Sequence, residues 1–393
     1  MMRTPEVAGL LDGVRVVSIE QAVAAPLCTR HLAELGASVI KIENPPTGDF
    51  ARAYDTSVAG SSAHFVWLNG GKRSVAVDLK TPLGMDVLMR LIDNCDVFVC
   101  NLAPSARERL IPDSVLAGRP GLIRCYVSGY GIDGPYAENK AYDALIQGET
   151  GAIAATGTPS NPVKCGMSVA DLGTGTYAFA LVNAALVRRT QTGEGCRIDV
   201  ALFDVMADWL SPLLLAERNG GHAPPPAGAR HAQIVPYGAY KTADGRLVNI
   251  AVQNDGQWKR FCVLVLQRAE FLERAGWSTN AQRTSDRTNL EPVLEDLISQ
   301  LTDNEFTERL DAADIPWGRV NTLSDAARHP QMEERGRWRR VDVGDGRTAE
   351  VLASPFFVDG AAESLSQIPG IGEHTGEVMK ELGFGDEYIA ALG

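Results

Sequence analysis

The chain has 393 residues, of which 45% are hydrophobic and 22% are charged. These proportions are close to the averages of soluble globular proteins, so they exclude a disordered or fibrous chain. Because the length exceeds what one hydrophobic core usually supports, we expect two lobes. The net charge of −12 argues against a nucleic-acid partner or an anionic membrane surface, since attraction to phosphate over long range requires a basic face.

The cysteines and the N-terminal segment indicate the compartment. The seven cysteines include neither a CxxC pair nor a Cys/His cluster with metal-ligand spacing, so we expect reduced thiols and no metal site. No run of about 18 apolar residues is present, which argues against a membrane span. Residues 1–9 lack the apolar core of a signal peptide. We therefore expect a cytoplasmic protein.

The first half of the chain alternates β-branched runs with helical stretches, the pattern of a parallel α/β sheet. Two helices each open with a proline, which the first turn of a helix tolerates. The strands are predicted at residues 14–20, 38–43, 74–79, 96–101, 122–128 and 197–200, and the helices at 26–35, 82–94 and 171–189. These elements predict a Rossmann-like, doubly wound lobe.

The second half begins with residues 219–229, whose glycine, proline and alanine content indicates a linker. A hairpin at residues 237–253 and three helices at 257–266, 290–299 and 304–313 then predict a smaller α+β domain. Charged helix and strand patterns return from residue 321 and end with a helix at 373–382. We expect a large α/β domain whose N-terminal part is residues 1–218, a small domain at 219–320, and a return to the large domain at 321–393.

Two glycine patterns match dinucleotide-binding signatures, at residues 129–134 and 173–178. Neither lies at the strand-to-helix turn where such a motif holds a pyrophosphate. The turn after the first strand, residues 20–26, contains no glycine. A nicotinamide cofactor is therefore not expected.

Four cations lie after or between the predicted strands: Lys72, Arg73, Arg107 and Arg109. Loops at these places collect ligands in α/β proteins, and paired cations suit phosphate groups. The spacing is equally compatible with ordinary solvated charges.

Asp171 stands at the start of the long helix, with Gly173 and Gly175 in the turn that follows. Aspartate is a favoured helix cap, contributing about 1 kcal/mol. Each glycine costs roughly 1 kcal/mol relative to alanine, which capping does not explain. The glycines would let a ligand or a neighbouring backbone come close, and a carboxylate at the positive end of a helix stays ionised, as a nucleophile must. From the residues alone, cap and nucleophile both stay open.

Among the six histidines, only His231, beside Arg230 and before the predicted hairpin, is placed where a lobe interface would present it to a substrate.

Short segments spread over the chain together resemble the class III CoA-transferases, the group that includes formyl-CoA transferase and was first grouped with carnitine dehydratase. The segments are residues 11–17, 25–29, 35–43, 48–49, 68–74, 129–131, 141–143, 169–171, 370–375 and 381–384.

The resemblance implies an interlocked homodimer whose large lobe contains both chain ends. It also implies that a CoA thioester binds as a substrate, with no permanently bound cofactor. Asp171 falls on the catalytic aspartate of the family, and Arg230 and His231 fall in a segment similar to that of enzymes acting on short dicarboxylates. Carried over by position, the CoA site comprises Val23, Ala24, Leu68, Lys72, Arg73, Asn101, Leu102, Arg109, Lys140, Ala141 and Tyr142.

The mechanism that the resemblance implies passes through an aspartyl anhydride and an aspartyl-CoA thioester, with a closing loop such as residues 253–257 as shelter from water. Val23 and Asn44 replace a glutamine and an arginine of formyl-CoA transferase, and its glycine-run loop is absent, which argues against formate and oxalate specificity. The alternative is an isomerase like the 2-methylacyl-CoA racemases. Those enzymes have a histidine where Tyr142 stands, so this chain would lack one of the two acid/base groups.

Overall fold

The computed structural model describes residues 9–344, 346–359 and 367–390. The chain divides into two compact units. Unit 1 comprises the described residues of Met1–Thr150, Cys165–Ser211 and Gln331–Gly393, and unit 2 comprises Gly151–Lys164 and Pro212–Pro330. These units group residues by proximity, and the predicted domain boundaries stay a prediction.

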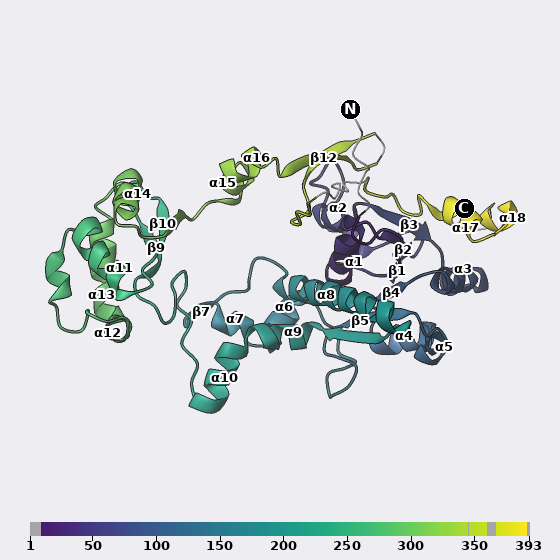
Figure 1. Ribbon diagram of the computed structural model, residues 1–393, viewed down its shortest axis with the longest axis horizontal. Helices are drawn as coiled ribbons and strands as arrows, with labels where there is room; N and C mark the ends of the chain where they lie inside the picture. The colour runs from purple at the N-terminus through teal and green to yellow at the C-terminus, as the bar shows by residue number, and fades with distance from the viewer. Residues whose placement is uncertain (1–8, 345, 360–366, 391–393) are drawn as a thin grey trace. The chain divides into compact units, whose positions relative to one another are not determined.

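Unit 1 is built on a six-stranded parallel sheet with the order β3-β2-β1-β4-β5-β8 (Figure 1). The order reverses direction between β1 and β4, where doubly wound sheets bind their ligands. The predicted Rossmann-like fold is thereby confirmed. The strands are β1 (Arg15–Ile19), β2 (Ser38–Glu43), β3 (Lys72–Ala76), β4 (Val97–Cys100), β5 (Ile123–Ser128) and β8 (Arg197–Ala201).

Helices cover both faces of this sheet. Val17 and Ile19 of β1 point to a core shared with α3 and α17, whereas α1 and α8 pack against each other and against the strands on the opposite face. The helical elements of unit 1 are α1 (Ala24–Glu34), the 3₁₀ turn η1 (Phe50–Ala53), α2 (Ala63–Asn69), α3 (Pro82–Asp93), α4 (Pro104–Leu110), α5 (Asp113–Ala117), α6 (Asp143–Glu149), α8 (Val169–Thr192), α9 (Leu202–Trp209), α16 (Pro330–Glu334), α17 (Thr375–Glu381) and α18 (Asp386–Ala390). A two-stranded hairpin of β12 (Trp338–Asp342) and β13 (Thr348–Leu352) packs on α2.

Two boundaries in unit 1 differ from the prediction in ways that affect the site. Strand β3 begins at Lys72, two residues early, because Lys72 and Arg73 pair with β2 and the Lys72 side chain is buried. Helix α8 begins at Val169, so Asp171 is its third residue and Ser168 is the N-cap. Asp171 is therefore not the helix cap.

Unit 2 contains the predicted hairpin, β9 (Tyr237–Lys241) and β10 (Leu247–Ala251), extended to three strands by β11 (Trp317–Arg319). A buried core that includes Trp258, Phe261 and Leu294 joins this sheet to its helices. The other elements are α7 (Ala152–Ala155), β6 (Gly157–Thr158), β7 (Asn161–Pro162), α10 (Ser211–Gly220), α11 (Asp255–Arg260), the π-helical η2 (Phe261–Val265), the 3₁₀ turn η3 (Ala269–Leu272), α12 (Asn280–Ser285), α13 (Arg287–Ile298), α14 (Asp303–Ala312) and α15 (Leu323–Ala327).

The segment 253–257, expected as a closing loop, is the capped start of a helix. Asn254 is the N-cap of α11, and its side chain accepts a hydrogen bond from the Gln257 backbone N–H at 2.9 Å. The Gln257 side chain in turn accepts from the Gln253 N–H at 2.6 Å. These bonds tie the segment to α11 rather than leaving it as a free loop.

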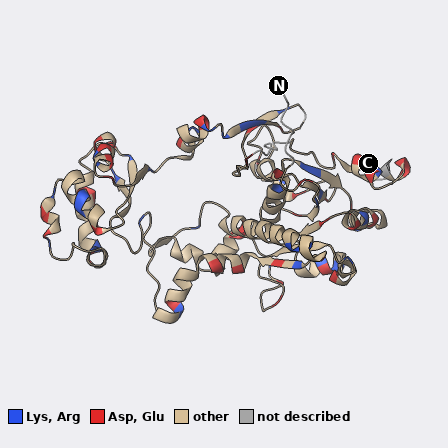
Figure 2. Cartoon of the chain, in the orientation of Figure 1, with Lys and Arg blue, Asp and Glu red and all other residues tan. Residues whose placement is uncertain are grey.

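Charged side chains of both signs are interspersed along each unit (Figure 2). None of the helices in the described part of the chain is both long and apolar enough to cross a membrane.

Candidate active site

Asp171 is partly buried in the first turn of α8. Among the described residues, its carboxyl group forms no hydrogen bond and no ion pair. Burial, reinforced by the negative charge of Asp143, raises the pKa of Asp171 from 3.8 to about 7. Near neutral pH the group is therefore divided between its acid and carboxylate forms, because burial and Asp143 outweigh the favourable helix end. This differs from the sequence-based expectation of a permanently ionised carboxylate.

Asp143, which lies in the neighbouring helix α6, binds the start of α8. Its Oδ1 accepts a hydrogen bond from the Ala170 backbone N–H at 2.9 Å, and its Oδ2 accepts one from Gln147 Nε2 at 2.7 Å. Ser168 makes no side-chain cap of its own. The carboxylate of Asp143 thus satisfies one of the free N–H groups with which a helix begins.

The two glycines after Asp171 serve the packing of helices. A Cβ at Gly175 would lie 2.5 Å from the carbonyl oxygen of Ala24, and one at Gly173 would lie 2.9 Å from Val205 Cγ1 and 3.0 Å from Trp209. Of the two explanations given for the glycines, close approach of a neighbouring chain segment is the one seen here. Gly175 brings α8 against the first turn of α1.

The first turn of α1 lies at the point where the sheet order reverses. Val23 and Ala24 follow β1, and Asn101 follows the adjacent β4. The Asn101 side chain donates to the Gln21 carbonyl at 2.8 Å and accepts from the Gln21 N–H at 3.0 Å, which locks the two turns together. Leu172, next to Asp171, packs against the cluster of Val23, Leu27 and Leu68. The structure thereby brings three predicted CoA residues, Val23, Ala24 and Leu68, beside the helix that carries Asp171.

The four predicted cations of the CoA site fall into two pairs. Lys72 is 2% exposed and its ammonium group donates to Glu20 at 2.7 Å, the Pro26 carbonyl at 3.0 Å and Asn69 at 3.2 Å. An ammonium group has three donors, so none is left for a phosphate. Arg73 forms ion pairs with two glutamates of α17. Arg109 and Lys140, by contrast, are exposed and form no ion pair within the described residues.

The comparison with known proteins decides the family. A family model described as CoA-transferase family III matches residues 11–375. The chain belongs to CoA-transferase family III. It is 32% identical over 383 residues to the succinate–glutarate CoA-transferase of Agrobacterium fabrum, covering 95% of each chain. It is 29% identical to the human succinyl-CoA:glutarate CoA-transferase, covering 97% of this chain and 88% of that one.

A solved structure agrees with this assignment. The crystal structure of a CAIB/BAIF family protein from Brucella suis matches with a TM-score of 0.83 and 33% sequence identity. The match covers 96% of this chain and 100% of that one. This chain is a family III CoA-transferase, as the sequence resemblance indicated.

The remaining predicted CoA residues of this CoA-transferase differ in their surroundings. Tyr142 is 60% exposed at the N-cap of α6. Ala141 packs on Gly129, where an added Cβ would lie 2.1 Å from the Ala141 Cβ. Leu102 is half-buried after β4, and Leu68 is fully buried in α2. Contact of these residues with CoA stays a prediction.

Arg230 and His231 belong to unit 2. The Arg230 guanidinium lies 3.1 Å from Glu291 and 2.6 Å from Glu295. The His231 ring stacks on Tyr237 with centroids 5.2 Å apart, and its Nδ1 accepts a hydrogen bond from the Gln233 N–H at 3.1 Å. Both side chains are therefore held within unit 2, and their contact with a substrate stays a prediction.

Sequence reasoning missed two residues near Asp171. The charge of Asp171 contributes to the raised pKa of Tyr54, after burial and Asp49, which places the Tyr54 phenol near the carboxyl group. Gln147 lies in α6, and nothing in its spacing separates it from an ordinary helix residue. For Asp143, the tripeptide 141–143 supplied a signal of family membership but not of a role in holding α8.

A buried ionic network supports the turn that carries Val23. Lys41 donates to Asp49 at 2.6 Å, and the other oxygen of Asp49 accepts from the Ala22 N–H at 3.1 Å. Ala22 has a φ of +64°, a strained conformation for a residue with a side chain. Asp49 therefore holds the first residues of the predicted CoA site in a fixed conformation.

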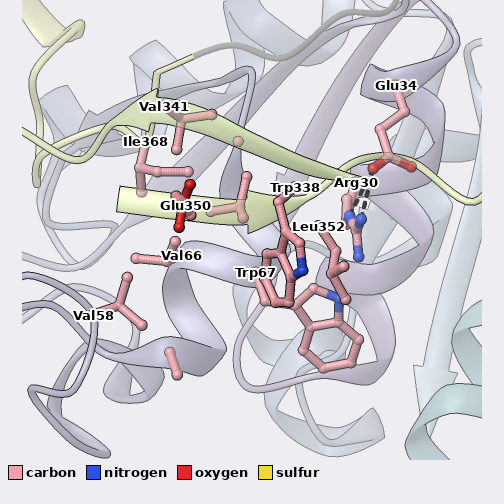
Figure 3. Close-up of a pocket in the computed structure, with 13 residues that line it drawn as sticks. Arg30, Glu34, Val58, Val66, Trp67, Trp338, Val341, Glu350, Leu352 and Ile368 are labelled. Carbon is pink, nitrogen blue, oxygen red and sulfur yellow. Dashed lines mark hydrogen bonds and ion pairs between the residues drawn. The ribbon is translucent and has the colours of Figure 1, made fainter. Parts of the chain in front are cut away.

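A separate pocket lies between α1, α2 and the β12–β13 hairpin (Figure 3). Its walls include Trp67, Trp338 and Leu352, with the ion pair of Arg30 and Glu34 at one end. Neither Asp171 nor any predicted CoA residue lines it. In the described part of the chain, no group of three or more His, Cys, Asp or Glu residues could hold a metal ion.

Proposed function

We propose that this enzyme transfers CoA from an acyl-CoA thioester to a short dicarboxylic acid, with Asp171 as the covalent carrier. The observation that carries the proposal is the carboxyl group of Asp171, which forms no bond to the part of the chain that the structure describes. It stands at the start of a helix that packs on the predicted CoA turn. A carboxyl group without internal partners is available for attack on a substrate. Its raised pKa makes its carboxylate form a stronger nucleophile than that of an ordinary aspartate.

The reaction would proceed in two symmetrical halves. A carboxylate oxygen of Asp171 attacks the thioester carbonyl carbon, the C–S bond breaks, and a mixed anhydride and a CoA thiolate form. The thiolate then attacks the Asp171 carbonyl carbon, which releases the donor acid and leaves an aspartyl-CoA thioester. The acceptor carboxylate attacks the carbonyl carbon of this thioester, the C–S bond breaks, and a second mixed anhydride and a CoA thiolate form. The thiolate then attacks the acyl carbonyl carbon of the acceptor in this anhydride, which forms the new acyl-CoA and releases the Asp171 carboxylate.

The residues around Asp171 would have distinct parts in this reaction. Val23, Ala24, Leu68, Asn101 and Leu102 would hold CoA at the reversal of the sheet order. Arg109 and Lys140 would bind its phosphates, since neither forms an ion pair within the described residues. Lys72 would act indirectly, by holding Glu20, because its three donors are already used.

The choice of dicarboxylates rests on the printed names of the relatives from A. fabrum and human, which act on succinate and glutarate. In this chain Arg230 and His231 would contact the distal carboxylate. Arg230 would exchange Glu295, its more exposed partner, for the substrate. A double variant, Arg230→Ala with His231→Ala, should lose preference for dicarboxylates over monocarboxylates of equal length, and an unchanged preference would remove both residues from the proposal.

We also propose that the enzyme works in the cytoplasm as an interlocked homodimer, as the family resemblance implies. Large apolar side chains left exposed in the single chain support a partner copy: Leu181, Val187, Leu215 and Phe357. Light scattering after size-exclusion chromatography would test the dimer, and a monomer at micromolar concentration would contradict it.

Intact-protein mass spectrometry with a panel of acyl-CoA thioesters tests the chemistry. An acyl-sized or CoA-sized adduct is expected on the wild type and on Asp204→Ala, an exposed aspartate of α9 that serves as control. Asp171→Ala should form no adduct. Absence of any adduct on the wild type would count against covalent transfer, and solvent deuterium entering the α-position of a branched acyl-CoA without an acceptor acid would favour the racemase alternative.

A further inference from the structure

The segment that leads into α8 lacks the usual means of fixing a helix start. Residues 165–168 precede the helix, and the N-cap Ser168 makes no side-chain hydrogen bond to it. The free N–H groups of a first turn otherwise fray or bind water. Because Asp171 lies in this turn, whatever holds residues 165–170 also sets the position of its carboxyl group.

Gln147 of α6 makes contact with this segment at two points. Its Oε1 accepts a hydrogen bond from the Cys165 N–H at 2.9 Å, and its Nε2 donates to the Met167 carbonyl at 3.3 Å. The same Nε2 donates to Asp143 Oδ2 at 2.7 Å. The side chain is 1% exposed, so water does not replace these bonds. Both donor hydrogens and the acceptor of the amide are thus engaged.

Gln147 also orients the carboxylate that caps α8. With Oδ2 of Asp143 held by Gln147, Oδ1 is directed to the Ala170 N–H, one residue before Asp171. Three points of the chain before the nucleophile, Cys165, Met167 and Ala170, are therefore held through one amide side chain, directly or through Asp143. Holding all three points requires a side chain that donates and accepts hydrogen bonds at the same time. A carboxylate or an apolar side chain of the same length cannot do both.

We propose that Gln147 is a positioning residue for the transfer reaction, which fixes the first turn of α8 so that the Asp171 carboxylate meets the thioester carbon. This inference rests on the proposed function of Asp171. A displacement of about 1 Å in a reacting group lowers rates by up to about 100-fold. The CoA-binding turns after β1 and β4 are on other elements and are held by their own bonds. Of the predicted CoA residues, Lys140, Ala141 and Tyr142 precede α6, so binding of the acyl-CoA should change much less than the rate of transfer.

The test compares Gln147→Met, which removes all three hydrogen bonds at similar volume, with Thr150→Val. Thr150 is a buried residue at the end of the same helix, and its hydroxyl donates to the Ile146 carbonyl. Rates are divided by the concentration of sites that bind CoA, so that unfolded protein does not lower the measured rate. We expect Gln147→Met to lower kcat and the rate of adduct formation on Asp171 by about 10- to 100-fold, with KM for the acyl-CoA within about threefold of the wild type. Thr150→Val should keep wild-type values.

A second variant separates positioning from general loss of stability. Gln147→Glu keeps the acceptor for Cys165 but places a negative charge beside Asp143. The titratable group that acts on the pKa of Asp171 is Asp143 of α6, and Asp171 in turn raises the pKa of Tyr54, which follows η1. The added charge should move the acidic limb of the pH–rate profile to higher pH, which a loss of stability alone would not do.

The two proposals fail in different ways. If Gln147→Met forms the Asp171 adduct at the wild-type rate and Gln147→Glu leaves the acidic limb in place, the positioning role is overturned while covalent transfer stands. If the wild type itself forms no adduct, the proposed covalent role of Asp171 is contradicted, and with it the role of Gln147 that rests on it.

Discussion

The buried carboxylate of Asp143 lies close enough to Asp171 to raise its pKa, while it also caps the helix on which Asp171 stands. One residue thus sets both the position and the protonation of the proposed nucleophile. Burial is the larger cause of the raised pKa, and Asp143 adds to it.

Activity should depend on pH through Asp171. Only the carboxylate attacks, so kcat/KM for the acyl-CoA should fall as the pH decreases below about 7. Asp143→Asn removes the neighbouring charge, which lowers the pKa of Asp171 and moves the acidic limb to lower pH. Profiles of kcat/KM between about pH 5 and pH 9 would measure this. An identical limb in both enzymes would show that Asp143 does not act on the titrating group.

Stability should depend on pH through the same residue, in the opposite sense. The pKa of Asp171 is raised from 3.8 to about 7 on folding, so the folded state binds the proton more tightly and loses stability as the pH rises through this window. Asp171→Asn removes this loss. The quantity to compare is the unfolding free energy of the variant minus that of the wild type. This difference should be roughly 1–3 kcal/mol larger near pH 8 than at about pH 4. Urea unfolding at both pH values tests this, and a difference independent of pH would contradict it.

Gly175→Ala should destabilise the protein although alanine favours helices. The gain in helix propensity is about 1 kcal/mol, but the new Cβ would lie 2.5 Å from the backbone oxygen of Ala24, which cannot move aside as a side chain can. We expect a net loss of about 1–3 kcal/mol by urea unfolding. The control is Gly166→Ala, where no described residue other than the two chain neighbours comes within 4 Å of the added Cβ, so little change is expected.

Lys72 and Arg73 are adjacent cations with different expected roles in stability. Lys72→Met leaves the carboxylate of Glu20 buried without its nearest cation, which should cost about 3–5 kcal/mol. Arg73→Met breaks ion pairs with exposed glutamates and should cost at most about 1 kcal/mol. Chemical denaturation of both variants measures the contrast, and equal losses would mean that the Lys72 pair is no stronger than a surface pair.

Arg109→Ala should weaken substrate binding without affecting the fold. Loss of one charged contact to a phosphate is expected to raise KM for the acyl-CoA about tenfold, more at low salt than at high salt. Arg119→Ala is the matched control, because Arg119 is engaged with Asp93. A KM for Arg109→Ala equal to that of the control would remove Arg109 from the CoA site.

The sequence by itself determined the strands of the unit 1 sheet, the longer helices between them and the family. Apolar runs with periods of two and 3.6 residues mark the sheet of unit 1 and its helices, because each element must bury one face within its own length. The segments that carry the family resemblance are likewise short and local. For this reason Asp171 was found as the candidate nucleophile before its surroundings were known.

The tertiary structure decided what each local feature does. Gly175 allows α8 to contact α1. The ammonium group of Lys72 forms a hydrogen bond to Glu20, which lies 52 positions away in the chain. The pKa of Asp171 is raised because the fold buries it and brings Asp143 of another helix beside it. Burial and the pairing of distant residues arise only when elements pack together, so no pattern within a single segment contains them.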